Sequence, residues 1–329
     1  MRGRDVLTFG LICLAAGVLT PRPVFTQPRY PERSIKLVIP YAPGGVTDAV
    51  GRLWVDKMKG LLGPVFIENQ GGAGGVVGTA AVARAQPDGY TILLGSAGSL
   101  VLVPAAASHA TYDPAKDLEP ISILGVTPLT IAIHPSVPAR TLKELIDYAK
   151  ADPGKLSYGS AGAGTMTHLT GELFKSLTGT SDIVHIPYKS GGQSIADLIS
   201  GHIPMITMNI NGQVLELHQS GKVRMLAVTT PARLTAAPDI PTAVEAGLPG
   251  MIAQNFYGLF VPAGTPKAII RQIAQATGRA MADDEFRQKL IASGFEPYLD
   301  STPETARRFV EEEIDRWTPV IRAIGLKLE

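Results

Sequence analysis

Two glycine-rich stretches hold the residues best suited to bind a negatively charged group. The first runs from Tyr41 to Asp48 (YAPGGVTD) after the apolar run Ile35–Ile39, and the second runs from Gly159 to His168 (GSAGAGTMTH). Both precede an apolar pattern with helical spacing, so each places unpaired backbone N–H groups and the positive end of a helix dipole beside its glycines. A helix terminus of this kind attracts anions. Because there are two such stretches, the sequence predicts one ligand gripped from two sides.

Neither stretch contains a lysine or an arginine, so a bound carboxylate would depend on neutral donors. We expect these to be the backbone N–H groups of the glycines and of Thr165, together with the hydroxyls of Thr47 and Ser160. Each such bond to a charged partner contributes roughly 1.5–3 kcal/mol, so three or four allow micromolar binding after ordering costs. The predicted ligand-binding residues are Tyr41, Gly44, Gly45, Thr47, Asp48, Ser96, Gly159, Ser160, Gly162, Gly164, Thr165, His168 and Asn209.

Four of these side chains also have a purely structural interpretation. Tyr41 would either wall the pocket or pack in the core, and Asn209 would either contact the far end of the ligand or serve as a turn residue. Asp48, or Thr47, is a candidate N-cap of the first helix, although Asp48 would meet the ammonium group of an amino-acid ligand. His168 would either support its loop or face the ligand.

The elements that position these loops alternate between strand and helix patterns. Apolar runs such as Ile35–Ile39, Val65–Asn69 and Tyr90–Leu94 indicate about ten strands, which favours an α/β fold with mainly parallel sheets. Since ligands bind at strand ends in such sheets, the loop Gly95–Ser99, with Ser96, is expected beside the first glycine loop. The residues from Ile121 to Ile133 predict strands interrupted by Gly125 and Pro128. Near the C-terminus, Ser301 to Glu304 predicts a capping box.

Other chemistries are disfavoured. The glycines of Gly71–Gly78 do not fit the dinucleotide spacing G-x-G-x-x-G, because the third position is Val77, and they predict a tight turn into a helix instead. The histidines show no metal-ligand spacing, and neither a metal nor a cofactor is expected. A hydrolase is the alternative that Ser99, Ser160 and several histidines suggest. No G-x-S-x-G nucleophile elbow occurs, so we expect no enzyme activity.

The N-terminus has the pattern of a secretory signal peptide. Arg2 and Arg4 precede an apolar run from Val6 to Leu19, and cleavage after Thr26 would remove residues 1–26. The alternative is a buried N-terminal helix. Cys13, the one cysteine, lies inside this run without the small residue before it that a lipoprotein signal needs, so lipid anchoring is not expected. Residues 27–329 carry 27 basic and 28 acidic residues, which gives no electrostatic footprint for nucleic acid.

Further along, the chain resembles the Bug, or TctC-type, extracytoplasmic solute receptors of tripartite tricarboxylate transporters. The resemblance covers nearly everything from Tyr30 onward. It is carried by KLVIPYAPGGVTD at 36–48, ENQGGAGG at 68–75, YGSAGAG at 158–164 with His168 and Leu169, RMLAV at 224–228, PDIPT at 238–242 with EAG at 245–247, and YG at 257–258 with PAGTP at 262–266. Gln70 and Gly71 stand where the family often has a basic residue and a proline, and Thr165 where it often has serine.

This resemblance implies a two-lobed Venus-flytrap periplasmic binding protein of the type II class. Residues 30–128 plus 256–329 would form lobe one, and residues 129–255 would form lobe two. In the family, the loops that correspond to 41–48 and 159–168 hold a ligand carboxylate through backbone amides and bridging water. A monomer in the periplasm is expected, which would bind a small organic carboxylate and deliver it to the transporter's membrane components. A receptor that reports its ligand to a sensor protein instead would have the same fold.

Overall fold

The computed structural model describes residues 30–107, 111–188 and 190–327. The predicted signal peptide, residues 1–26, lies outside the described residues. None of the helices in the described ranges combines the length and the hydrophobicity that crossing a bilayer requires.

The first lobe is built on a sheet in which β1 (Ile35–Ile39) is flanked by β2 (Val65–Asn69) and β3 (Thr91–Ser96). Both pairings are parallel, as the apolar runs predict. Next to β3 lies β9 (Gln254–Pro262), then β4 (Leu118–Ile133) and the short β10 (Glu296–Pro297), all joined by antiparallel pairing. The sheet is therefore mixed rather than wholly parallel.

The second lobe is built around β7 (Met205–Asn209), which lies between β4 and β5 (Ser157–Ser160). β6 (Val184–Pro187), β5 and β7 run parallel, whereas β4 pairs antiparallel with β7 and with β8 (Arg224–Val228). The carboxyl ends of β5 and β7 thus point to the same edge, where the second glycine loop begins.

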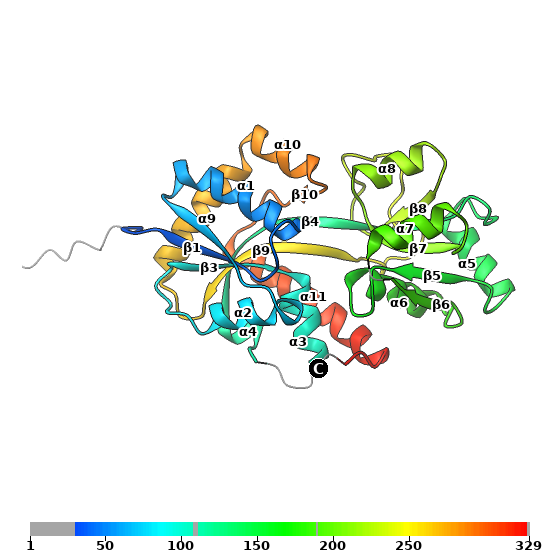
Figure 1. The fold of residues 1–329 in the computed structure, drawn as a ribbon, viewed down its shortest axis with the longest axis horizontal. Coiled ribbons are helices and arrows are strands. Elements are labelled where there is room, and N and C mark those ends of the chain that lie inside the picture. Colours follow the sequence, from blue (N-terminus) through cyan, green and yellow to red (C-terminus); the bar gives the residue numbers. More distant parts are fainter. Residues whose placement is uncertain (1–29, 108–110, 189, 328–329) are drawn as a thin grey trace, which may run out of the picture.

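Two long strands, β4 and β9, connect the lobes (Figure 1). β4 pairs with β9 up to Pro128 and with β7 and β8 from Leu129 onward, so one continuous strand belongs to both sheets. The predicted interruptions at Gly125 and Pro128 are wrong. Irregular register between β4 and β9 lets the strand continue past Gly125. A Cβ at Gly125 would meet the Glu296 carbonyl oxygen at 2.8 Å, so glycine is needed there for β10 to approach.

Helices cover both faces of each sheet (Figure 1). In the first lobe α1, α9 and α10 pack on one face, and α2, α3 and α11 on the other. In the second lobe α5 and α6 share one face, and α7 and α8 the other. Their bounds are α1 Val46–Leu61, α2 Val76–Ala83, α3 Val103–Ala106, α4 Pro114–Asp117, α5 Leu142–Ala151, α6 Met166–Thr178, α7 Gly191–Ile199, α8 Gly212–Gln219, α9 Lys267–Met281, α10 Asp284–Ala292 and α11 Pro303–Ala323, with a 3₁₀ turn η1 at Ala73–Gly75 and a π-helical turn η2 at Gly98–Leu102.

The C-terminal helix α11 contacts the helix α6 of the second lobe as well as β4. Trp317 and Ile321 are fully buried in the same hydrophobic cluster as Leu169 and Phe174 of α6. The predicted capping box is shifted by one residue: Thr302 is the N-cap and exchanges hydrogen bonds with Thr305. Ser301 instead accepts the backbone N–H of Ile123, which fastens the start of α11 to β4.

Candidate functional site

The first glycine loop joins the end of β1 to α1, and α1 begins without a side-chain cap. Gly45 is the N-cap residue, in an extended conformation, so neither Thr47 nor Asp48 caps the helix as predicted. Among the described residues, the Gly45 N–H has no hydrogen-bond acceptor, whereas the Gly44 N–H is bonded to the Asp48 carboxylate at 2.9 Å. The uncapped first turn is therefore the part of this loop that can still receive an anion.

Asp48 is buried and serves to hold the first loop. Its carboxylate accepts hydrogen bonds from the Gly44 N–H, from Arg52 Nε at 2.8 Å and from Asn69 Nδ2 at 3.1 Å. Burial alone would raise the pKa of Asp48, but hydrogen bonds from Arg52, Gly44 and Asn69 together hold it below its usual value. The sequence did not single out Arg52 or Asn69; the spacing of Arg52, four residues after Asp48 on one helix, was the available signal.

Tyr41 joins the ends of β1 and β3. Its hydroxyl lies 2.8 Å from Ser96 Oγ, and Asn69 Nδ2 donates to its carbonyl oxygen at 3.1 Å. A Cβ at Gly98 would lie 2.9 Å from the Tyr41 hydroxyl, and one at Gly75 would lie 3.1 Å from it. The ring is half-buried among these three loops, which places Tyr41 and Ser96 together beside the first glycine loop.

In the second glycine loop, most of the predicted donors already have acceptors. The Gly162 N–H binds Ser160 Oγ at 3.1 Å, the Gly164 N–H binds His168 Nδ1 at 3.2 Å, and the Thr165 N–H binds the Gly162 carbonyl at 3.3 Å. Thr165 caps α6 through a bond from the His168 N–H. With Gly44, these bonds show that the expectation of unpaired amides is wrong for these four groups. Side chains of the loops accept from Gly44, Gly162 and Gly164, and a backbone carbonyl accepts from Thr165.

Behind the second loop lies a stack of three rings that the sequence did not reveal. The His185 ring lies between Tyr158 and His168, with centroid distances of 4.8 and 4.0 Å, and its Nε2 is 2.7 Å from Ser160 Oγ. The Tyr158 hydroxyl donates to Glu172 at 2.8 Å. His168, predicted as a site residue, therefore supports the loop from behind, and His185 joins it because β6 pairs with β5.

Burial lowers the pKa of both histidines. Desolvation is the largest cause for each, and the neighbouring His168 lowers the pKa of His185 further, to about 4. Glu172 opposes these shifts, while Lys175 adds to them. Both rings are therefore neutral near pH 7, which is the state in which His168 Nδ1 can accept the Gly164 N–H.

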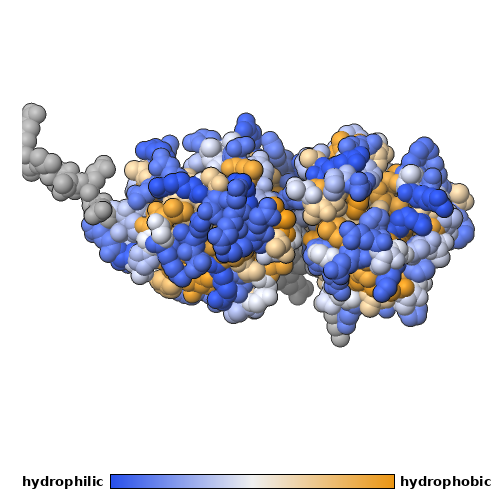
Figure 2. Space-filling model, turned by 90° about the horizontal axis from the view of Figure 1, so that it is seen from above, coloured by the Kyte–Doolittle hydropathy of each residue, from blue (hydrophilic) through white to orange (hydrophobic). Residues whose placement is uncertain are grey.

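The two glycine loops lie at the ends of their lobes that face one another (Figure 1). In the space-filling view the molecule is indented between the two lobes (Figure 2). Asn209, exposed at the carboxyl end of β7, and Gly159, in β5, belong to the second lobe's half of this region. Gly159 has a packing role, since a Cβ there would approach Ile203 to 2.7 Å.

Comparison with known proteins identifies the family. The model of the "Tripartite tricarboxylate transporter family receptor" matches residues 50–326. The chain belongs to this receptor family. Its members are substrate-binding receptors, not enzymes, and the two lobes described above are those of a periplasmic binding protein.

Relatives of this receptor family align along most of the chain. Protein BugT of Bordetella pertussis is 34% identical over 99% of both chains. R. palustris Rpa4515 with adipate is 32% identical, with a TM-score of 0.72 over 91% of this chain and 99% of that one. MatC of Rhodopseudomonas palustris with bound malate is also 32% identical, with a TM-score of 0.70 over 89% and 100% of the two chains.

Proposed function

We propose that this receptor captures a small organic carboxylate between its lobes and delivers it to the membrane components of a tripartite tricarboxylate transporter. The lobes would comprise residues 30–128 plus 256–329 and residues 129–255, and residues 1–26 would direct export to the periplasm. The observation that carries the proposal is the uncapped, glycine-lined start of α1, which faces the second glycine loop. The adipate and malate complexes of two relatives support the ligand class.

In this mechanism the free N–H groups of the first turn of α1 receive one side of the carboxylate. An uncapped helix terminus contributes up to about 2 kcal/mol, and each charge-assisted hydrogen bond roughly 1.5–3 kcal/mol. The second loop contributes after the lobes close, through Ser160 and Thr165. Its backbone amides would bind the ligand either in addition to their present acceptors or in place of them. Tyr41 and Asn209 would form walls of the ligand-binding cleft. Closure is favoured because the ligand reaches both sets of donors only in the closed form.

The Asp48 carboxylate is compatible with a bound acid nearby, because its charge is already neutralised by Arg52 and two N–H donors. An ionised side chain left unpaired beside the ligand would repel an acid. Because its hydrogen bonds are satisfied within the loop, Asp48 holds the loop conformation. The ligand's acid group would then be bound by backbone N–H groups.

A thermal-shift screen of carboxylates, including adipate and malate, on purified protein tests the proposal. We expect at least one acid to raise the melting temperature at micromolar to millimolar concentration, and its primary amide to fail. Equal stabilisation by acid and amide, or a shift from no acid in the screen, would contradict carboxylate capture. Uptake of the selected acid by cells that express the receptor with a tripartite transporter tests delivery separately.

A further inference from the structure

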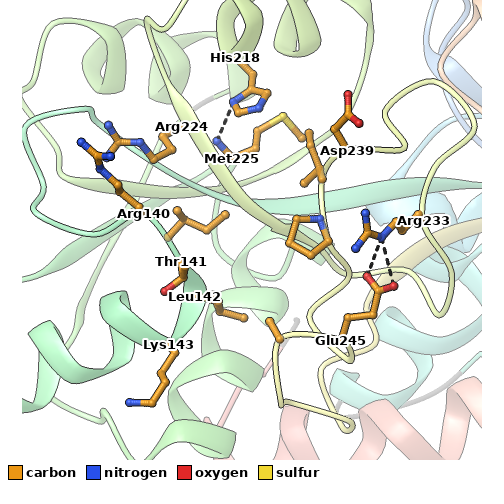
Figure 3. A pocket seen from close by; sticks show the side chains of 14 residues that line it. Arg140, Thr141, Leu142, Lys143, His218, Arg224, Met225, Arg233, Asp239 and Glu245 are labelled. Carbon is orange, nitrogen blue, oxygen red and sulfur yellow. Dashed lines mark hydrogen bonds and ion pairs between the residues drawn. The ribbon is translucent and has the colours of Figure 1, made fainter.

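A second recessed surface lies in the second lobe, away from the glycine loops. It encloses about 850 Å³ between the start of α5, the end of α8, β8 and the segment 233–246 (Figure 3). Its base is apolar and rigid, because Leu142, Met225, Leu226 and Ile240 are all at most 5% exposed and belong to the two hydrophobic clusters of this lobe. We call it the Arg224 pocket, after the cation anchored in its wall.

Four cations line the Arg224 pocket, and two of them are already neutralised. Lys143 pairs with Asp147 at 2.5 Å, and Arg233 forms a two-bond pair with Glu245 at 2.9 and 3.1 Å. In Figure 3 the Lys143 ammonium points away from the recess, and the Arg233–Glu245 pair lies at one end of it. These two residues therefore leave no positive charge available to a ligand.

Arg140 and Arg224 differ from the other two cations. Their guanidinium groups lie together at the other end of the pocket (Figure 3), and within the described ranges neither forms an ion pair with a carboxylate. Arg224 is half-buried, and its Nη1 is anchored on the carbonyl oxygens of Ala139 at 2.8 Å and Val137 at 3.5 Å. The nearby Glu144 carboxylate is bonded to the Arg140 backbone N–H at 2.6 Å.

A half-buried guanidinium that has carbonyl partners but no counter-ion keeps its full positive charge and its remaining N–H donors for an anion. Arg224 is fixed by its carbonyl partners, so its remaining N–H groups keep a constant direction at little entropic cost on binding. Arginine's planar donors match a carboxylate in geometry and charge. The apolar base beside them suits a hydrocarbon chain, whereas Asp239 and the neutralised Arg233–Glu245 pair at the far end offer no second cation.

We propose that the Arg224 pocket is a second binding site, which takes a carboxylate attached to an apolar body at the Arg140–Arg224 end. The same chemistry is offered by a free organic acid and by a glutamate side chain of a protein partner. The site lies outside the proposed ligand-binding cleft, and its occupancy does not depend on the glycine loops.

Methyl NMR of ¹³C-methionine-labelled protein tests the two sites separately. Met225 lies in the base of the Arg224 pocket, whereas Met166 is the first residue of α6 beside the second glycine loop. The probes are hexanoate, its uncharged analogue hexanamide, and the peptides acetyl-Leu-Glu-Leu-amide and acetyl-Leu-Gln-Leu-amide. The Met225 signal is assigned with the variant Met225→Leu. A change at Met166 alone reports the cleft and leaves the pocket unoccupied.

We expect hexanoate or the glutamate peptide to shift the Met225 signal saturably, with hexanamide and the glutamine peptide inactive. A response to hexanoate assigns a free acid, and a response to the peptide alone assigns a protein partner. Arg140→Gln should weaken this binding about tenfold, and Arg224→Lys should weaken it while keeping the charge. Lys143→Gln, which removes the same charge from the same rim, should not. An unmoved Met225 signal, or equal affinity in both arginine variants and the parent, would overturn the proposal.

Discussion

The imidazole rings of His168 and His185 are stacked, with centroids 4.0 Å apart and planes inclined by 19°. Two protonated rings at this distance would repel each other, so the stack requires that at least one stays neutral. Each ring is tied to the second glycine loop, His168 through Gly164 and His185 through Ser160. The ionisation of this pair is therefore coupled to the conformation of a candidate ligand-binding loop.

Acidification should destabilise the protein through these histidines. A base whose pKa is lowered by folding takes up protons more readily in the unfolded state. Its contribution to the free energy of unfolding is therefore complete above about pH 6.5 and declines as the pH falls toward the folded-state pKa. For His185 that window ends at about 4. We expect a loss on the order of 1 kcal/mol, after allowing for solvent screening, in urea unfolding experiments between pH 7 and pH 4.5.

The variant His185→Gln isolates this effect, because its amide can replace Nε2 beside Ser160 but cannot be protonated. Its unfolding free energy should fall less steeply with acidification than that of the parent. His202→Gln, at an exposed histidine, is the matched control for exchanging a histidine for glutamine. Parallel slopes for His185→Gln and the parent would contradict the assignment.

His168 should determine ligand affinity through one hydrogen bond. In His168→Asn the side-chain oxygen can take the place of Nδ1 and accept the Gly164 N–H, whereas His168→Ala leaves this N–H without its partner. A typical hydrogen bond contributes about 1 kcal/mol, so we expect about fivefold weaker binding of the acid found in the thermal-shift screen by His168→Ala, and near-parent binding by His168→Asn. Calorimetric titration at pH 7.5 measures both, and equal losses in the two variants would argue that ring stacking, not the bond, matters.

Gly45→Val should abolish ligand-induced thermal stabilisation without unfolding the protein. Gly45 has φ −83°, and a Cβ there would have no atom closer than the Ala42 carbonyl oxygen at 4.0 Å, so the fold tolerates a side chain. The same side chain would cover the free N–H groups of α1. Gly278→Val, in open space on α9, is the control. A normal ligand shift in Gly45→Val would remove the first loop from the site.

Gly162→Val is expected to behave differently from Gly45→Val. Gly162 has φ +130°, a conformation that L side chains rarely adopt, so the substitution should lower the melting temperature even without ligand. A loss of binding by Gly162→Val would therefore report loop strain together with any lost contact. Comparing the two unliganded melting temperatures checks this expectation, which fails if they are equal.

Asp48→Asn should weaken both the fold and ligand binding. Removing the charge leaves Arg52 without its ion pair and weakens the bonds from Gly44 and Asn69, at an expected cost of about 1–2 kcal/mol in unfolding free energy. Asp56→Asn, on the same helix but with an exposed pair to Lys59, should change stability much less than Asp48→Asn. Denaturant titration of both variants measures their unfolding free energies. Equal losses in the two variants would contradict the role of Asp48 in holding the first loop.

Glu313 should stabilise the junction of α11 with the second lobe. Its carboxylate is 2% exposed, accepts from Trp317 Nε1 at 3.0 Å and pairs with Arg316 at 2.7 Å. Burial raises its pKa despite Arg316. Glu313→Ala leaves a buried N–H unpaired and should cost about 2–3 kcal/mol in urea unfolding, whereas Glu313→Gln keeps an acceptor and should cost less. Glu311→Gln is the exposed control, and similar costs for all three would contradict this role.

Much of the fold could be predicted because its signals are local. The apolar run Ile35–Ile39 is a strand, Thr141 caps α5, and the helical spacing of Phe309, Val310, Trp317 and Ile321 marks a buried face. The predicted break in β4 is wrong because it rests on the low intrinsic strand propensity of Gly125 and Pro128. Pairing with β9 along the whole segment outweighs that propensity.

The sequence by itself determined where the two glycine loops lie, at strand ends that open into helices, because glycine content and apolar period are properties of neighbouring residues. Only the tertiary structure decided which loop amides are free. The acceptors of Gly44 and Gly164 are Asp48 and His168, side chains whose orientation depends on Asn69 and His185. Those two residues reach the loops through the register of β2 on β1 and of β6 on β5. A hydrogen bond forms only between groups that lie close in space. For residues on separate strands, spacing along the sequence does not determine that distance.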